Sequence, residues 1–448
     1  MLILLSAVAA MTTFVTPDTK ALPRYQFKVG QEIKYRSQSE FLYGKGDTKS
    51  TLGNRGELTA WVIRNNPDGG WRIIVQSETF SWQTQGKNDK KNERSDGKTL
   101  AYFDISPDGT IPHNDSFGYR FNPSTYFPKL PASDVKSWEV ADDAEGDKIR
   151  CTTVASEKPG EFVFDAVRES PMDKIYLSSS SSQLVFDIAT GMIVRGTTKN
   201  TQGYGFEGQG TGTIEMTGIQ MRGEDFLKPL TIEAEAYFAA EKRYQELSKL
   251  AAKSGDKAKD LFADAEKAIK DAQGIVKIDA IKEQLESKLK SHTQYVKYSI
   301  EDAERKAKIV GKPSAEWKTT DLAGKEFSNE SLKGKVVVMD FWYRGCGWCI
   351  KAMPQMNQLA DDFKNDNVVI IGMNTDRDEK DAKFVIDAMK LNYNTLKGEG
   401  LPTKFGVQGF PTLVIIDKEG NVHDLHVGYS KTLREEVGKT IRELLAKK

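Results

Sequence analysis

Cysteine and histidine are scarce in this sequence, and their scarcity limits the chemistry that it can support. The 448 residues include three cysteines and four histidines. A structural zinc site would need a second ligand pair at short spacing beside a cysteine pair. None of the histidines supplies one: His113, His292, His423 and His426. We therefore expect neither a metal site nor an organic cofactor.

An excess of charge of one sign is also missing. Lysine and arginine together number 64, as do aspartate and glutamate, so the formal net charge is zero. Non-specific nucleic acid binding depends on an excess of basic side chains that neutralise phosphates. The composition therefore gives no reason to expect a nucleic acid partner.

No apolar run in the sequence is long enough to cross a bilayer, and one short run lies at the N-terminus. Residues 1–10 read MLILLSAVAA, which is typical of the hydrophobic part of a signal peptide with a small-residue cleavage site. The run lacks preceding positive charges and is too short to cross a bilayer unaided. We predict that residues 1–21 are a signal-like segment and that the protein is extracytoplasmic, in the periplasm or cell envelope, where it is either exported or tethered at its N-terminus. The alternative is an apolar tail.

The most informative stretch that is present is a cysteine pair, Cys346-Gly347-Trp348-Cys349, directly after the apolar run of residues 336–342. Two intervening residues at a helix start let both sulfurs come within bonding distance. The helix dipole favours a thiolate on the first sulfur, and a thiolate is the nucleophile that opens a disulfide. We predict a redox dithiol with Cys346 exposed and reactive and Cys349 shielded. Half a zinc site and a purely structural bridge are the alternatives.

The chain is too long for one ordinary domain, and its composition changes along its length. Residues 22–222 read as strands, with a strong hairpin signal between residues 58 and 75, and predict an antiparallel β domain, as a sandwich or an open curved sheet. Residues 225–308 are rich in Ala, Lys, Glu and Leu and predict an α-helical connector; a partner-binding coiled coil is the alternative. Residues 310–448 alternate strand and helix, which predicts an α/β domain.

Residues 310–446 also carry several motifs in a fixed order. They are Val310-Gly311-Lys312-Pro313, Asp321-Leu322-Ala323-Gly324-Lys325, Leu332-Lys333-Gly334-Lys335, Asp340-Phe341-Trp342, the cysteine pair, Met353-Pro354 and Gly409-Phe410-Pro411-Thr412. In this order they resemble the TlpA/ResA-like branch of bacterial extracytoplasmic thioredoxins. The resemblance covers the last third of the chain. It implies a thioredoxin-like fold and thiol–disulfide oxidoreductase activity.

The resemblance further implies roles for residues around the dithiol. Asp340 matches a buried acid whose raised pKa lets it take the proton of the second thiol; a satisfied acid at a strand end is the alternative. Phe410 and Pro411 match a cis-proline loop that holds an extended substrate strand, against an ordinary trans proline. Trp348 is expected to contact the substrate.

Three positions depart from the family pattern. Gly345 stands where many relatives have tryptophan, Trp348 replaces the common proline, and Ala352 occupies the position of a buried glutamate in the cytochrome-maturation branch. The missing proline frees a backbone N–H at the helix start, so we expect a redox potential different from that of a CGPC site. The missing glutamate weakens the case for apocytochrome as the substrate.

Together these features predict an exported thiol–disulfide oxidoreductase that acts on protein disulfides or dithiols and depends on a membrane or envelope electron donor. Two other functions stay open. A thiol peroxidase would share the fold, although the threonine of the peroxidatic Pro-x-x-x-Thr-x-x-Cys pattern is missing here. Alternatively, the β domain binds an envelope ligand or protein. Cys151 is expected to be a buried inert thiol, with a reactive or intermolecularly paired thiol as the alternative.

Overall fold

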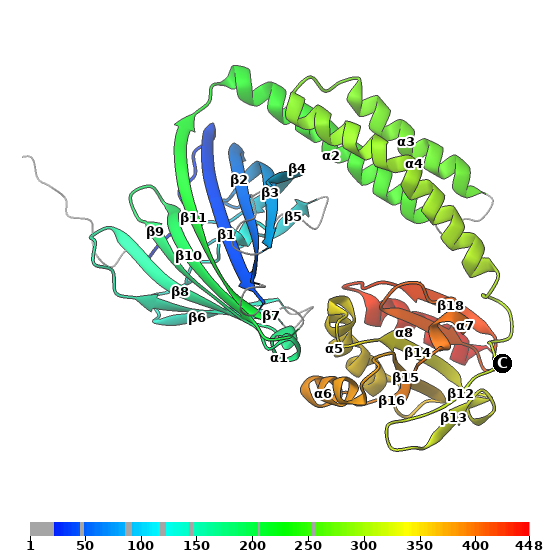
Figure 1. Ribbon diagram of the computed structural model, residues 1–448. Helices are drawn as coiled ribbons and strands as arrows, with labels where there is room; N and C mark the ends of the chain where they lie inside the picture. Colours follow the sequence, from blue (N-terminus) through cyan, green and yellow to red (C-terminus); the bar gives the residue numbers. More distant parts are fainter. Residues whose placement is uncertain are drawn as a thin grey trace, which may run out of the picture.

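The computed structural model describes residues 22–44, 49–85, 92–116, 122–142, 147–204, 207–251 and 257–447. Within these ranges the chain forms a large antiparallel sheet, a unit of long helices and a C-terminal α/β domain (Figure 1). The signal-like segment predicted at residues 1–21 lies outside the described residues.

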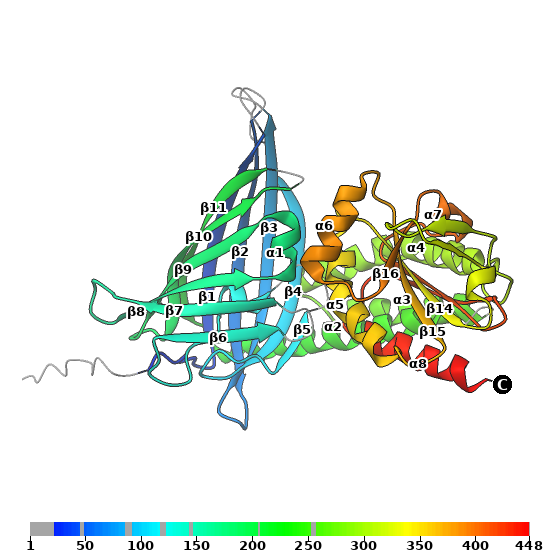
Figure 2. The same cartoon turned by 90° about the horizontal axis from the view of Figure 1, so that it is seen from below.

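The N-terminal domain is one open, curved sheet of eleven strands and not a two-sheet sandwich (Figures 1 and 2). The strand order is β5-β4-β3-β2-β1-β11-β10-β9-β8-β7-β6, with antiparallel neighbours throughout. The predicted hairpin is confirmed, because Trp61 pairs with Ile74. The strands are β1 (Gln31–Tyr43), β2 (Ser50–Asn65), β3 (Trp71–Gln85), β4 (Arg94–Ile105), β5 (His113–Ser116), β6 (Ser137–Asp142), β7 (Asp147–Val154), β8 (Glu161–Glu169), β9 (Ser179–Asp187), β10 (Met192–Gln202) and β11 (Gly208–Met221).

Alternation of apolar and polar residues places one face of this sheet in a core. In β1, Ile33 and Tyr35 are buried, whereas Lys34 and Arg36 are exposed. Cys151 of β7 lies in the same core, and burial raises the pKa of its thiol to about 12. Because the thiolate is the reactive form, this environment favours the inert-thiol interpretation of Cys151.

A short helix, α1 (Pro171–Tyr176), joins β8 to β9 at one end of the sheet (Figure 1). A capping box defines its start: the Ser170 hydroxyl accepts the N–H of Met172 at 3.2 Å, and the Asp173 carboxylate accepts the N–H of Ser170 at 2.8 Å. Figures 1 and 2 show that α1 is the part of the β domain nearest to α5 and α6 of the C-terminal domain.

Three long helices follow the sheet: α2 (Glu224–Ala251), α3 (Ala258–Gln273) and α4 (Asp279–Ala307). Leu230, Tyr237 and Leu285 pack with Trp61 and Ile74 of the sheet. These two strand residues point to the face opposite the core, because strand side chains alternate. The helical unit therefore packs on β2, β3 and β4, on the face opposite the core, before the chain enters the C-terminal domain. No helix in the described part of the chain combines the length and the apolar character that a membrane crossing requires.

The C-terminal domain is a five-stranded mixed sheet with helices on both faces. The order is β16-β15-β14-β17-β18, in which β14, β15 and β16 run parallel and β17 and β18 are antiparallel. Two apolar clusters, one on each face, separate the sheet from its helices. The elements are β12 (Lys318–Thr320), β13 (Glu326–Ser328), β14 (Val336–Trp342), α5 (Gly347–Asp362), β15 (Val368–Asn374), α6 (Glu379–Met389), β16 (Asn394–Lys397), α7 (Leu401–Lys404), β17 (Thr412–Ile416), β18 (Val422–Val427) and α8 (Leu433–Ala446).

Candidate functional site

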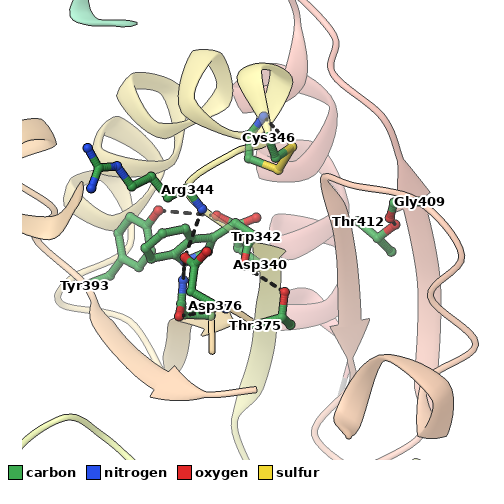
Figure 3. Close-up of a disulfide and its surroundings, with 11 residues drawn as sticks. Asp340, Trp342, Arg344, Cys346, Thr375, Asp376, Tyr393, Gly409 and Thr412 are labelled. Atoms are coloured by element: carbon green, nitrogen blue, oxygen red, sulfur yellow. Dashed lines mark hydrogen bonds between the residues drawn. A yellow bond between two sulfur atoms is a disulfide. The ribbon is translucent and has the colours of Figure 1, made fainter. Parts of the chain in front are cut away.

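The dithiol lies where a buried strand gives way to a helix. All seven residues of β14 are buried, and a short loop joins this strand to α5. Cys346 is the N-cap residue of α5, and its sulfur accepts the N–H of Cys349 at 3.1 Å. The two cysteines form a disulfide with Cα atoms 5.2 Å apart (Figure 3). The positive end of the α5 dipole therefore faces the first sulfur, where it favours a thiolate after reduction.

Both cysteines are covered in this structure. Cys346 is 6% exposed and Cys349 is 2% exposed. The prediction of an exposed Cys346 is therefore wrong for this form of the protein, although the order of exposure is the expected one. The physical reason is a contact that comes from the β domain: Ile175 of α1 is fully buried in the same apolar cluster as the two cysteines.

Asp340 lies in the middle of the central strand, with Gly372 of β15 on one side and Leu413 of β17 on the other. Asp340 is 1% exposed, and one of its carboxylate oxygens has no hydrogen-bond partner among the described residues. The other oxygen accepts the hydroxyl of Tyr393 at 3.3 Å. Figure 3 shows Asp340 and Tyr393 below the disulfide in that view.

Burial dominates the electrostatics of this acid. Loss of hydration raises the pKa of Asp340 from 3.8 to about 7, and the hydrogen bond from Tyr393 partly opposes that rise. Burial, together with the nearby carboxylate, raises the pKa of Tyr393 well above its usual value, so Tyr393 acts only as a donor. A carboxyl group that titrates near neutral pH is suited to exchange a proton with a thiol.

Replacing Tyr393 with phenylalanine should raise the pKa of Asp340 further. The tyrosine hydroxyl donates to the carboxylate and so favours its charged form; without this bond, burial acts alone. Carbon-13 NMR titration of the labelled Asp340 carboxyl in the oxidised protein measures the change. Tyr298→Phe, at an exposed tyrosine, is the matched control. An unchanged or lower pKa in Tyr393→Phe would contradict the assignment of this hydrogen bond.

The loop before β17 borders the dithiol. The Phe410–Pro411 peptide bond is cis, as predicted. Phe410 packs against the apolar cluster that contains both cysteines, and its ring meets Tyr343 edge-on at 5.2 Å. The Thr412 hydroxyl donates to the Gly409 carbonyl at 2.8 Å across the same turn (Figure 3). The structure thus brings together the dithiol and the loop that was expected to hold a substrate.

Trp348 gives the site an exposed aromatic surface. Its side chain lies between the two cysteines in sequence and is 46% exposed, in contrast to the cysteines themselves. The ring stacks on Tyr429 with a centroid distance of 5.5 Å, and the Lys351 ammonium lies 5.3 Å from its centroid. A stacked, half-exposed pair of rings offers apolar area at little cost in side-chain entropy.

Sequence reasoning missed Arg344, which stands two residues before Cys346. Its guanidinium donates to Asp381 at 2.8 Å, and its backbone N–H donates to Asp376 at 2.9 Å. The side chain points away from the disulfide in Figure 3. The only signal for Arg344 in the sequence was a charge in the loop before the dithiol. Its partners, Asp376 and Asp381, lie more than thirty positions away along the chain, so no local pattern indicates these contacts.

Metal ligands are not gathered at this site. Across the residues that the structure describes, no three His, Cys, Asp or Glu side chains lie close enough together to hold a metal ion.

Comparison with known proteins places relatives over the same part of the chain. The family model described as Redoxin matches residues 309–441. Thiol-disulfide oxidoreductase ResA of Bacillus thuringiensis is 33% identical over 128 residues, which are 28% of this chain and 74% of that protein. Thioredoxin-like protein YneN of Bacillus subtilis is 28% identical over 122 residues, or 26% of this chain and 71% of that protein.

A solved structure matches a similar share of the chain. The thioredoxin domain of a thiol-disulfide oxidoreductase from Bacteroides vulgatus is 29% identical, with 30% of this chain and 97% of that chain covered and a TM-score of 0.28. The residues that the Redoxin model matches include β14, α5 and the loop before β17, which form the site described above.

Proposed function

We propose, from the premise that the chain belongs to the ResA family of thiol–disulfide oxidoreductases through its C-terminal domain, that Cys346 and Cys349 exchange disulfides with protein substrates outside the cytoplasm. The observation that carries this proposal is a disulfide at the N-terminus of α5, with a buried acid of raised pKa on the strand that leads to it. A disulfide with a purely structural role would need neither a place at a helix N-terminus nor a buried acid with a raised pKa.

The reaction is a two-step exchange in which each sulfur has a separate role. In the reduced protein, the Cys346 thiolate attacks one sulfur of a substrate disulfide; a mixed disulfide forms, and the other substrate sulfur leaves as a thiolate that takes up a proton. Cys349 then loses its proton and attacks Cys346. The internal disulfide forms and the second substrate sulfur leaves. The protein gives up two electrons and the substrate disulfide gains them; the reverse sequence oxidises a dithiol substrate.

Asp340 is the proposed acceptor of the proton that Cys349 loses. Its carboxyl is buried in the strand beneath α5 and has a pKa of about 7, so it is divided between its charged and neutral forms at neutral pH. A general base is most effective when its pKa lies near the working pH. One of its oxygens has no other partner among the described residues and is available for this role.

Phe410, Pro411 and Trp348 are the proposed substrate contacts. Phe410 borders the cysteines from the loop before β17, and Trp348 extends the apolar surface on the α5 side. A substrate segment that lies along the loop can pair with backbone groups as an added strand. This arrangement suits a polypeptide better than a compact small molecule.

An extracytoplasmic location fits the same chemistry. The apolar run at residues 1–10 resembles part of an export signal, and disulfides of protein substrates persist in oxidising compartments. A protein that reduces them there needs electrons from a membrane or envelope donor, since the cytoplasmic thiol pools are out of reach.

The activity is tested by reduction of insulin disulfides with dithiothreitol as the final donor. The full-length protein should accelerate the reaction, and Cys346→Ala should bring the rate down to that of dithiothreitol alone. Cys151→Ala is the matched control, because that cysteine is buried in the β-domain core, and its rate should equal that of the wild type. Full activity of Cys346→Ala would contradict the proposed function.

A further inference from the structure

The β domain contributes a surface to the dithiol site. Helix α1, between β8 and β9, rests on the N-terminus of α5 (Figures 1 and 2). Ile175 is fully buried in the cluster that contains both cysteines, and Met172 and Tyr176 pack at its edge. At Gly347, the residue after Cys346, an added Cβ would lie 3.2 Å from the Met172 methyl and 3.6 Å from the Tyr176 hydroxyl. The space above the dithiol is therefore filled by another domain.

Arg344 holds this contact from the C-terminal domain. Its guanidinium donates to the Ile175 carbonyl at 3.1 Å and lies 3.7 Å from the centroid of the Tyr204 ring. On its own domain it pairs with Asp381 and lies over Phe384 at 4.1 Å. Arg344 is 9% exposed. A buried guanidinium with partners in both domains indicates a built contact, because an unmatched charge would not be stable there.

Tyr204 is hydrogen-bonded to α1 within the β domain. The backbone N–H groups of Gly203 and Tyr204 donate to the Tyr176 carbonyl at 3.1 and 3.0 Å. The segment that stacks on Arg344 is thus bound to the end of α1. A change at Tyr204 should therefore weaken the α1 contact from the β-domain side, because it removes the ring that stacks on Arg344 and leaves the residues of the dithiol loop unchanged.

We propose that α1 is a steric gate that determines which substrates reach Cys346. The inference rests on the proposed function. An exchange step needs the incoming sulfur in line with the bond that breaks, and a folded protein cannot present a disulfide to Cys346 while α1 occupies that side. Protein disulfides exchange when α1 has moved away from α5, whereas small disulfides need far less room. The contact consists mainly of one short helix and one arginine, and relative motion is the default expectation for domains within a chain unless their interface is large and hydrophobic.

Two substitutions on the β-domain side should open the gate and place no charge beside the cysteines. Ile175→Ala removes most of the apolar side chain that α1 buries in the cysteine cluster, and Tyr204→Ala removes the ring that covers Arg344. Lys98→Gln is the matched control, because it removes an ion pair of 2.6 Å between the sheet and α4, another contact between units of the chain. Tyr204→Ala keeps the test valid if Ile175→Ala does not fold.

The experiment compares single-turnover oxidation of the reduced full-length proteins by insulin and by the small disulfide DTNB. The structure has α1 docked on the dithiol, so both gate variants should react with insulin at least about tenfold faster than the wild type, because activity scales with the open population. Their rates with DTNB should stay within about threefold of the wild-type rate. Lys98→Gln should match the wild type with both substrates.

Three results would overturn the gate. An unchanged ratio of insulin to DTNB rates in both variants shows that α1 does not select substrates. A slower reaction with insulin alone shows that α1 helps to bind protein substrates instead. If no protein, wild type included, reacts with either disulfide, the proposed function fails and the gate with it.

Discussion

Replacing Cys349 with serine should trap the protein in covalent complexes with its substrates and abolish turnover. Cys346 can still attack a substrate disulfide, but no second thiol is present to release the mixed disulfide. Cys151 cannot substitute, because it is buried in the core of the β domain and burial raises the pKa of its thiol to about 12. The complexes should run as discrete bands on non-reducing gels of an envelope extract, and mass spectrometry should place the bond at Cys346.

The companion substitution distinguishes the two sulfurs. Cys346→Ser should trap little, because the remaining thiol is 2% exposed and lies one turn inside α5, away from the helix end. Cys349→Ser combined with Cys151→Ala should trap as much as Cys349→Ser alone. Equal trapping by Cys346→Ser and Cys349→Ser would contradict the proposed order of attack.

Replacing Asp340 with asparagine should slow exchange at neutral pH by about 10²-fold, the lower range for loss of a general base. Asparagine keeps the shape of the side chain but cannot accept the proton of Cys349. In the wild type, the rate should rise as the pH passes about 7, where the carboxyl becomes charged; in Asp340→Asn that rise should disappear. Stopped-flow tryptophan fluorescence across pH 5–9 measures both rates, with Asp366→Asn, at an exposed acid, as the control. An unchanged profile would assign Asp340 a structural role.

The same substitution, which slows exchange, should make the folded protein more stable above neutral pH. Asp340 has a raised pKa in the folded protein, so the folded state binds more protons than the unfolded state between pH 3.8 and about 7. Below pH 3.8 the carboxyl is neutral in both states, and its full contribution to stability is present. As the pH rises towards 7 that contribution is lost, and the free energy of unfolding falls by roughly 4 kcal/mol in total.

Asp340→Asn removes this loss because the amide is neutral at every pH. We expect the variant to be the more stable protein at pH 8, with a difference that shrinks as the pH falls towards 4. Hydrogen exchange of β14 amides in the oxidised proteins, followed across urea concentrations, measures the difference for this domain. A variant that is less stable than the wild type at pH 8 would contradict the raised pKa.

Local patterns in the sequence were enough to find the centre of the site. The apolar run and the spacing of the two cysteines predicted a strand followed by a helix, and the structure has β14 and α5 at those places. The resemblance of Gly409-Phe410-Pro411-Thr412 to the cis-proline loop of the thioredoxin family predicted a cis bond at Pro411, and that bond is cis. Each of these predictions depends on residues that are close together in sequence, where the physical cause is local.

Features that depend on distant residues could not be found in this way. Arg344 and Ile175 are 169 positions apart, and nothing in either segment indicates that they meet. Tyr393 lies 53 positions from Asp340 and donates to it only because β16 enters the sheet next to β15. The covered state of Cys346 has the same origin, since no local pattern reports which part of another domain will rest on a helix end.

The central claim is that Cys346 and Cys349 interconvert between dithiol and disulfide while the protein stays folded. Equilibration of the full-length protein with mixtures of reduced and oxidised dithiothreitol, followed by acid quench, thiol labelling and mass spectrometry, tests it most directly. We predict a reversible two-electron transition confined to these two residues, in which a tenfold change in the equilibrium ratio corresponds to about 30 mV, while the labelling of the free thiol Cys151 stays the same at every ratio. A bond that is reduced only after the protein has been unfolded would be a structural bridge and would contradict the account.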